Sequence, residues 1–302
     1  MASVKIVGLI VGAVAVATLV VNSTFAEDPQ HTTAATAVSM ATVAGPIDGP
    51  DAGSAARARV VRVSAEDFKF DAPDAIPAGL TDFRFLNKGP ALHHMQILKL
   101  ESGKTVNDLR AALTQPGPPP AWVKEVGGPN APAPGVESNA TLMLEPGNYA
   151  LICFVDIDGP PHFMKGMLQG LRVGPATGPA ASKPTADVTV TLSDYSFKPS
   201  APIQKGLRTI RVINEGAQHH EIELVKLAPG ASVDDFMKWI AKMEGPPPGK
   251  PLGGVSGIDK GMSEYFSADF SPGNYAFICF LPDAKDGKPH FAHGMVQQFT
   301  VN

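Results

Sequence analysis

The sequence predicts an all-β protein with two tandem Greek-key β-sandwich domains, each carrying a short helical insertion. The second half repeats the first, because Asp67-Phe68-Lys69-Phe70 is matched by Asp194-Tyr195-Ser196-Phe197, 127 positions further on. Short apolar or alternating segments are separated by turn signals that contain Pro-Gly-Asn, as is typical of antiparallel sandwiches. The length of 302 residues leaves about 115 for each copy, which is the size of one domain.

The N-terminus has the pattern of an export signal. Lys5 precedes an almost wholly apolar run at 6–21, and Thr24 and Ala26 are small residues that suit a signal-peptidase site. We therefore predict a signal peptide over 1–26 and a periplasmic or secreted protein. The alternative is an uncleaved anchor, because the run is only slightly short for a spanning helix. Contact with a membrane is expected only in that case.

Two segments rich in Ala, Gly and Pro divide the remaining chain. They predict flexible linkers at 27–58 and 175–187, and therefore domains at 59–174 and 188–302. The net charge is −4, and no cluster of Lys or Arg provides the basic surface that nucleic acid requires. We therefore exclude nucleic acid as a partner.

Strands are predicted where apolar residues alternate or run together between the turn signals. The expected strands include Val60–Val63, Thr81–Leu86 and Leu142–Leu144 in the first copy, and Val188–Leu192 and Thr209–Ile213 in the second. In the later strand of each copy, alternation places Tyr149 and Cys153 on one face and Tyr275 and Cys279 on the equivalent face. We therefore expect each thiol to point inward at a strand end.

One segment in each copy has helical rather than strand spacing. Lys104–Gln115 and Ser232–Met243 place their apolar residues on one helix face and end at clusters of Gly and Pro, which cannot continue a helix. The apolar faces are formed by Val106, Leu109 and Leu113 in the first copy and by Val233, Phe236 and Ile240 in the second. Each sandwich is therefore expected to carry a helix between two strands.

The repeat also carries residues with metal-binding chemistry. Each copy has a histidine, a Tyr-x-x-x-Cys strand and a Pro-His-Phe-x-x-Gly-Met tail. The residues are His93, Cys153, His162 and Met167 in the first copy, and His220, Cys279, His290 and Met295 in the second. Two imidazoles, one thiolate and a weak axial thioether are the donors of a blue-copper electron-transfer site. The pattern therefore predicts one copper site in each copy.

These motifs resemble those of the cupredoxin family, the fold of plastocyanin and azurin. The resemblance rests on Asn-x-Gly-x-x-x-His, then Pro-Gly-Asn-Tyr-x-x-x-Cys, then His and Met, and it covers nearly all of both predicted domains. It implies that the eight residues just named hold one type 1 copper in each domain. Eight residues separate Cys from the second His in the first copy and ten in the second, where small blue-copper proteins usually have two to four.

Several alternative hypotheses about the same residues remain open. The two cysteines could form a disulfide between the domains, as cysteines of exported proteins often do, or remain inert buried thiols. His94 and His219 stand beside the favoured histidines and are the alternative ligands. A metal-free interaction module of the cell envelope and a copper storage or delivery protein are the alternative functions.

The favoured function is outer-sphere electron transfer with a redox partner protein. Two-domain copper nitrite reductases and laccase-like oxidases, in contrast, flank the type 1 cysteine with histidines that lead to a second copper centre. Here the flanking residues are Ile152 and Phe154 in the first copy and Ile278 and Phe280 in the second. Because that relay is missing from both copies, we expect the protein not to be an enzyme.

Overall fold

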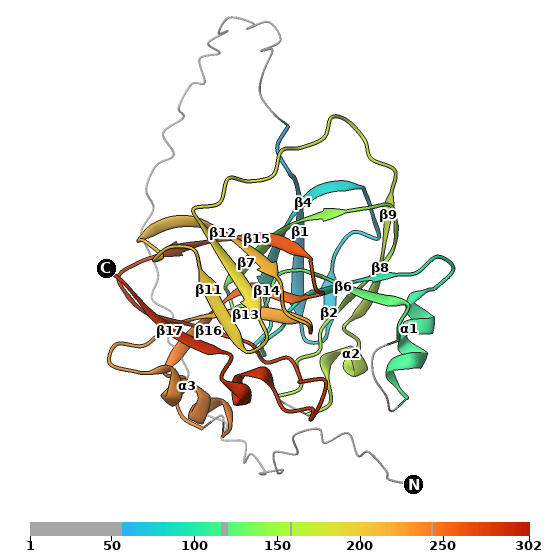
Figure 1. Ribbon diagram of the computed structural model, residues 1–302. Coiled ribbons are helices and arrows are strands. Elements are labelled where there is room, and N and C mark those ends of the chain that lie inside the picture. Colours follow the sequence, from blue (N-terminus) through green and yellow to red (C-terminus); the bar gives the residue numbers. More distant parts are fainter. Residues whose placement is uncertain (1–55, 116–119, 158, 243) are drawn as a thin grey trace, which may run out of the picture. The chain divides into compact units, whose positions relative to one another are not determined.

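The computed structural model describes residues 56–115, 120–157, 159–242 and 244–302 (Figure 1). The predicted signal peptide at 1–26 and nearly all of the predicted linker at 27–58 lie outside these ranges. Both predicted domains fall within one compact unit that includes Ala55–Asn302. Among the described residues, no helix has the length and apolar character needed to cross a membrane.

The first half forms two β-sheets that face each other across a core. One sheet contains β1 (Arg59–Glu66), β2 (Lys69–Asp71), β4 (Gly79–Asn87) and β7 (Glu137–Leu144). The other contains β3 (Ala75–Pro77), β5 (Gln96–Leu100), β6 (Val123–Gly127), β8 (Gly147–Ile152) and β9 (Leu168–Gly174). The prediction of a β-sandwich is therefore confirmed.

The second half has strands at equivalent places. β10 (Val188–Ser193), β11 (Ser196–Pro199), β12 (Gly206–Asn214) and β15 (Ser263–Phe270) form one sheet. β13 (His220–Leu227), β14 (Gly249–Ile258), β16 (Gly273–Ile278) and β17 (Val296–Val301) form the other. All five strands predicted above lie within observed strands.

The sequence patterns predict an antiparallel sandwich, but some of the strand pairs are parallel. β1 pairs with β4 in parallel, and β10 pairs with β12 in the same way. The chain between β1 and β4 first forms β2 and then crosses to the other sheet as β3, so it can return in the same direction. A hairpin could not give this arrangement, because a tight turn reverses the chain.

Alternation along the cysteine strands separates two layers of the core. Tyr149, Leu151 and Cys153 lie in the main core between the two sheets. Ala150 and Ile152 point the other way, into a smaller cluster beneath a helix. β8 is therefore covered on both faces, and the predicted inward direction of the thiol is confirmed; β16 has the same arrangement around Cys279.

The covering helices are α1 (Val106–Leu113) and α3 (Val233–Ile240), which lie on the outer side of their sheets (Figure 1). Thr105 and Ser232 are the N-caps of these helices, and each forms a capping box. The cap hydroxyl accepts from the backbone N–H of an aspartate three residues later, and the carboxylate of that aspartate accepts from the backbone N–H of the cap. Leu109 and Phe236 are buried in the smaller clusters, and the other residues of the predicted apolar faces are half-buried against them. Helical insertions between two strands are therefore confirmed, although both are shorter than predicted.

The two halves are joined by strand pairing between equivalent strands. β7 pairs with β15 and β6 pairs with β14, so both sheets run through the junction and contain strands of both halves. In an isologous dimer interface, the same surface of both subunits forms the contact. Here the pairing of equivalent strands gives that arrangement within one chain. Asn139 and Ser267 exchange two hydrogen bonds of 2.7 and 2.8 Å across it.

Candidate metal centre

Three of the predicted ligands of the first half meet in one buried cluster. His93 precedes β5, Cys153 follows β8 directly, and His162 begins the short helix α2 (His162–Lys165). The two imidazole Nδ1 atoms are 3.0 Å apart, and the Cys153 Sγ lies 3.6 Å from the Nδ1 of His162. All three side chains are fully buried. Two nitrogens and one sulfur therefore converge where a single ion could contact all three.

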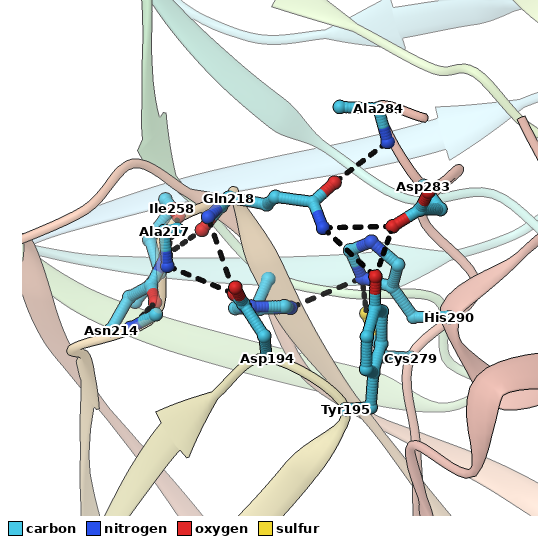
Figure 2. Close-up of polar contacts among 12 residues, drawn as sticks. Asp194, Tyr195, Asn214, Ala217, Gln218, Ile258, Cys279, Asp283, Ala284 and His290 are labelled. Carbon is cyan, nitrogen blue, oxygen red and sulfur yellow. Dashed lines mark hydrogen bonds and ion pairs between the residues drawn. The ribbon is translucent and has the colours of Figure 1, made fainter. Parts of the chain in front are cut away.

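The second half has the same cluster at His220, Cys279 and His290. The Nδ1 atoms of the histidines are 3.1 Å apart, and the Cys279 Sγ is 3.4 Å from the Nδ1 of His290 (Figure 2). Within each half, the donor atoms of the three residues all lie within 4.8 Å of one another. The His–Cys–His geometry is therefore present twice in the described part of the chain.

The methionines are held next to the cysteines by backbone hydrogen bonds. The N–H of Cys153 donates to the carbonyl of Met167 at 3.1 Å, and the N–H of Met167 donates to the carbonyl of His162 at 3.0 Å. Met167 is fully buried in the same core cluster as Cys153. Met295 has the equivalent bonds to Cys279 and His290, at 3.2 and 3.0 Å, and is equally buried.

The long loop after each cysteine folds back on itself instead of opening outward. In the first half, the N–H of Phe163 donates to the carbonyl of Cys153 at 2.9 Å, and the N–H of His162 donates to Val155. In the second half, the N–H of Phe291 donates to Cys279, and His290 to Leu281. Because these bonds close the loop at its base, the extra residues do not move the second histidine away from the thiol.

A carboxylate that the sequence analysis did not assign to the site holds the first histidine of each half. The Nε2 of His93 lies 2.6 Å from Asp67, and the Nε2 of His220 lies 2.9 Å from Asp194. A carboxylate on Nε2 places the ring proton there and leaves Nδ1 as a lone-pair donor toward the cluster. The repeated Asp of Asp-Phe and Asp-Tyr was the available sequence signal.

An aromatic ring from the same dipeptide covers the second histidine. Phe68 packs edge-on against His162 with ring centroids 4.8 Å apart, and Tyr195 packs against His290 at 5.5 Å. The Tyr195 hydroxyl donates to Asp283, which also accepts from the Gln218 amide at 2.8 Å (Figure 2). These two hydrogen bonds lower the pKa of Asp283 below its usual range. Each site is thus closed by an aromatic cap, and the cap of the second half is polar.

Burial sets the protonation states of the cluster. Desolvation, followed by the proximity of His220, lowers the pKa of His290 to about 4, so this imidazole is neutral at neutral pH and can donate a lone pair. Desolvation is also the main reason that the pKa of the Cys279 thiol is raised well above its usual value. A metal cation bound there would displace the thiol proton, because thiolate ligation removes the cost of an unpaired buried charge.

The alternative ligand assignments do not fit the structure. The Nε2 of His94 accepts from the backbone N–H of Phe154 at 2.7 Å, and His219 faces Glu125 across 4.0 Å. Neither histidine belongs to a His–Cys–His cluster. Cys153 and Cys279 form no disulfide, since each is buried in the site of its own half. The disulfide alternative is therefore wrong.

Copper fits this donor set. Two imidazoles with one thiolate, beside a buried thioether, match the soft, mixed N and S ligands of copper electron-transfer sites, and hard cations would need carboxylate or carbonyl oxygens instead. Both halves therefore have cupredoxin-like architecture with a candidate copper site at the end of the cysteine strand.

Comparison with known proteins finds similarity to solved structures only. No family model matches the chain, and no curated protein matches it. Among solved structures, auracyanin from Roseiflexus castenholzii is 19% identical with a TM-score of 0.26, and the match covers 40% of this chain and 100% of that one. The blue copper oxidase from Nitrosomonas europaea is 18% identical with a TM-score of 0.26, covering 82% and 86%. A copper-containing nitrite reductase from Thermus scotoductus is 15% identical with a TM-score of 0.22, covering 82% and 68%.

These matches correct the prediction that the protein is not an enzyme. The matched structures include multicopper oxidases and a copper-containing nitrite reductase as well as auracyanins. The absence of histidines beside Cys153 and Cys279 argues against only one kind of relay to a second copper. It does not exclude other enzymatic chemistry, so the prediction is wrong.

Replacing Asp67 by Asn should weaken copper binding at the first site by about 10- to 100-fold, because an amide cannot accept the Nε2 proton of His93 as strongly and can turn its NH₂ toward it. The affinity would be measured by competition with a chelator of known strength. Asp71→Asn is the control, since Asp71 is exposed on β2. Equal affinity in the Asp67 variant and its parent would show that the carboxylate does not support the site.

Proposed function

We propose that this chain is an exported copper protein that transfers electrons through a type 1-like site in each domain. The proposed ligands are His93, Cys153, His162 and Met167 in the first domain, and His220, Cys279, His290 and Met295 in the second. The observation that carries the proposal is the convergence of two Nδ1 atoms and one thiol, fully buried, in both halves. Copper bound by such donors would supply a one-electron couple.

The protein's own contribution is to hold the ligands still and keep water out. His93 and His220 are fixed by carboxylates on Nε2, and the cysteines are fixed at the ends of strands buried on both faces. A set of donors that cannot rearrange suits a site whose two oxidation states need similar geometry. Full burial of the ligands favours electron transfer over copper delivery, because a delivery site has to give its ion to a partner's ligands.

Export and a redox partner protein complete the proposal. The apolar run at 6–21 followed by Thr24 and Ala26 supports a cleaved signal peptide. Thiolate copper sites that exchange electrons with a protein partner need no substrate pocket beside the metal. The signal peptide can be tested by intact-mass measurement of protein recovered from the periplasm, which should lack residues 1–26.

The direct test is an absorption spectrum with metal analysis of the full chain, expressed with its own N-terminal segment, loaded with Cu(II) and desalted. We expect an intense thiolate-to-copper band at roughly 600 nm, or at roughly 450 nm for a more tetragonal site, and about two copper ions per chain. A colourless protein that retains no copper would contradict the proposal and favour a metal-free interaction module.

Replacing Met167 by Gln should keep copper at the first site and lower its reduction potential, because a harder oxygen donor in the axial position favours Cu(II). The potential would be measured by spectroelectrochemistry, with Met164→Leu as the control, since Met164 is exposed on α2. If the potential of the Met167 variant equals that of its parent, Met167 is not an axial ligand.

A further inference from the structure

A chain of buried hydrogen bonds starts beside the cysteine of the first half. The backbone N–H of Phe154, the residue after Cys153, donates to the Nε2 of His94 at 2.7 Å. The His94 side chain also interacts with the side chain of Asn130. Because Nε2 accepts, the other ring nitrogen carries the proton of the neutral imidazole and is the donor available to the Asn130 amide oxygen. The chain thus runs from the cysteine strand to the junction between the halves.

A matching chain starts beside the cysteine of the second half and meets the first. The backbone N–H of Phe280, the residue after Cys279, donates to the Oε1 of Glu221 at 2.8 Å. The amide nitrogen of Asn130 donates to the Oε2 of the same carboxylate at 3.2 Å. Three side chains therefore link the backbone groups beyond the two cysteines, and we call them the bridge: His94, Asn130 and Glu221.

The bridge joins equivalent positions with different chemistry. His94 follows His93 and Glu221 follows His220, so the two side chains stand at the same place in each half and bond the same backbone group beyond each cysteine. One is a donor toward the junction and the other an acceptor, and an amide between them can serve both at once. Two histidines or two glutamates could not be joined by one asparagine in this way.

The bridge is sealed from water. His94 is 7% exposed, Asn130 is 3% exposed and Glu221 is 4% exposed. Asn130 is held further by hydrogen bonds to the carbonyls of Ile222 and Val255 and from the N–H of Ala131. Burying a polar group without a hydrogen-bond partner is costly, so buried polar groups are expected to be paired. The hydrogen bonds of Asn130 therefore hold the bridge in a single arrangement.

We infer that the bridge of His94, Asn130 and Glu221 is the electron path between the two metal sites of this chain. The inference rests on the proposed function. One electron passes from one site to the other, so one is oxidised by one electron and the other reduced by one, and no bond is formed or broken. The first electron comes from an external one-electron reductant. In this arrangement an electron received by either domain is available at both.

The path is tested by following a single electron inside the protein. Copper-loaded full-length chain carrying Met295→Gln, which lowers the potential of the second site, receives less than one electron per molecule from a pulse of methyl viologen radical. Absorbance changes at the two charge-transfer bands then report movement between the sites. We expect a phase whose rate does not depend on protein concentration. Two coloured, separately reducible sites without such a phase would overturn the inference.

Variants of the bridge decide whether it carries the electron. Asn130→Leu in the same background removes the central amide of the bridge, with its hydrogen bond to Glu221, and should slow the intramolecular phase severalfold. The matched control is Asn139→Leu, which removes the two hydrogen bonds between the Asn139 side chain and the Ser267 backbone across the junction but contacts neither site. Thermal unfolding of both variants shows that they remain folded at the temperature of the experiment.

A milder variant keeps the test decisive if Asn130→Leu does not fold. In Glu221→Gln, the single amide oxygen can accept either from Phe280 or from Asn130, so one bond of the bridge is lost while the shape is kept. Both potentials are measured so that the rates can be compared at equal driving force. An unchanged rate in a coloured protein would overturn the bridge, whereas the absence of colour in every variant and in the parent would instead contradict the proposed function.

Discussion

Replacing Cys153 by serine should remove the charge-transfer absorption of the first site and leave that of the second. A serine hydroxyl stays protonated near neutral pH and has no low-energy sulfur electrons to give, so copper held by the remaining ligands would be nearly colourless. Cys279→Ser should remove the other half of the absorption, and the double variant should have none. The measurement is the visible spectrum per bound copper.

The controls separate loss of the thiolate from loss of the fold. Both cysteines are buried beside two imidazoles and form no disulfide, so the smaller serine hydroxyl loses packing contacts there and costs some stability. Far-ultraviolet circular dichroism should show an intact β-fold in each variant, and Met164→Leu should leave the spectrum unchanged. A double variant that keeps the band would show that copper binds elsewhere.

Much of the candidate site could be predicted because its donors recur at fixed places in a repeated pattern. The thiols were placed by strand alternation, which fixes side-chain direction whatever the sheet packs against. The helical insertions were predicted by apolar spacing, as Leu109 and Phe236 show by their burial beneath the sheets. Local rules were sufficient for these features, because each depends on a short stretch of chain.

The features that were missed depend on contacts between distant segments. Asp67 and Asp194 lie 26 residues before the histidines they hold, in a turn whose partners no local pattern reveals. The aromatic caps Phe68 and Tyr195 belong to the same turn and would be read as ordinary core residues. The long loop is closed on Cys153 by backbone hydrogen bonds, which almost any sequence can form. The side chains of the loop therefore give no sign of this closure.

The contacts at the junction between the halves could not be predicted from the sequence either, because ionisable side chains that would be expected on the surface are buried there. Glu264 of β15 is fully buried, its Oε2 accepts from the N–H of Gly128 at 3.1 Å, and its Oε1 has no hydrogen-bond partner among the described residues. A Cβ at Gly127 would lie 2.2 Å from that Oε1, so this carboxylate fills space that the glycine leaves open.

This carboxylate should make the protein less stable as the pH rises. Burial raises the pKa of Glu264 well above its usual value of 4.5, so the folded state keeps a proton that the unfolded chain has lost. The stabilisation is complete below the unfolded pKa and is lost as the pH rises to the folded pKa, at about 1.4 kcal/mol per pH unit. Glu264→Gln, which stays neutral, should remove this part of the slope and be more stable than its parent at about pH 8.

Chemical denaturation between about pH 5 and pH 8 would measure the effect as the difference between variant and parent. Taking that difference is essential, because burial also raises the pKa of Glu223 and that of Glu221, the latter to about 7, and both remain in the variant. Glu101→Gln is the control, since Glu101 is exposed and should give the same slope as the parent. Parallel pH profiles for Glu264→Gln and its parent would mean that Glu264 is ionised in the folded protein, with its charge stabilised by the junction rather than suppressed by burial.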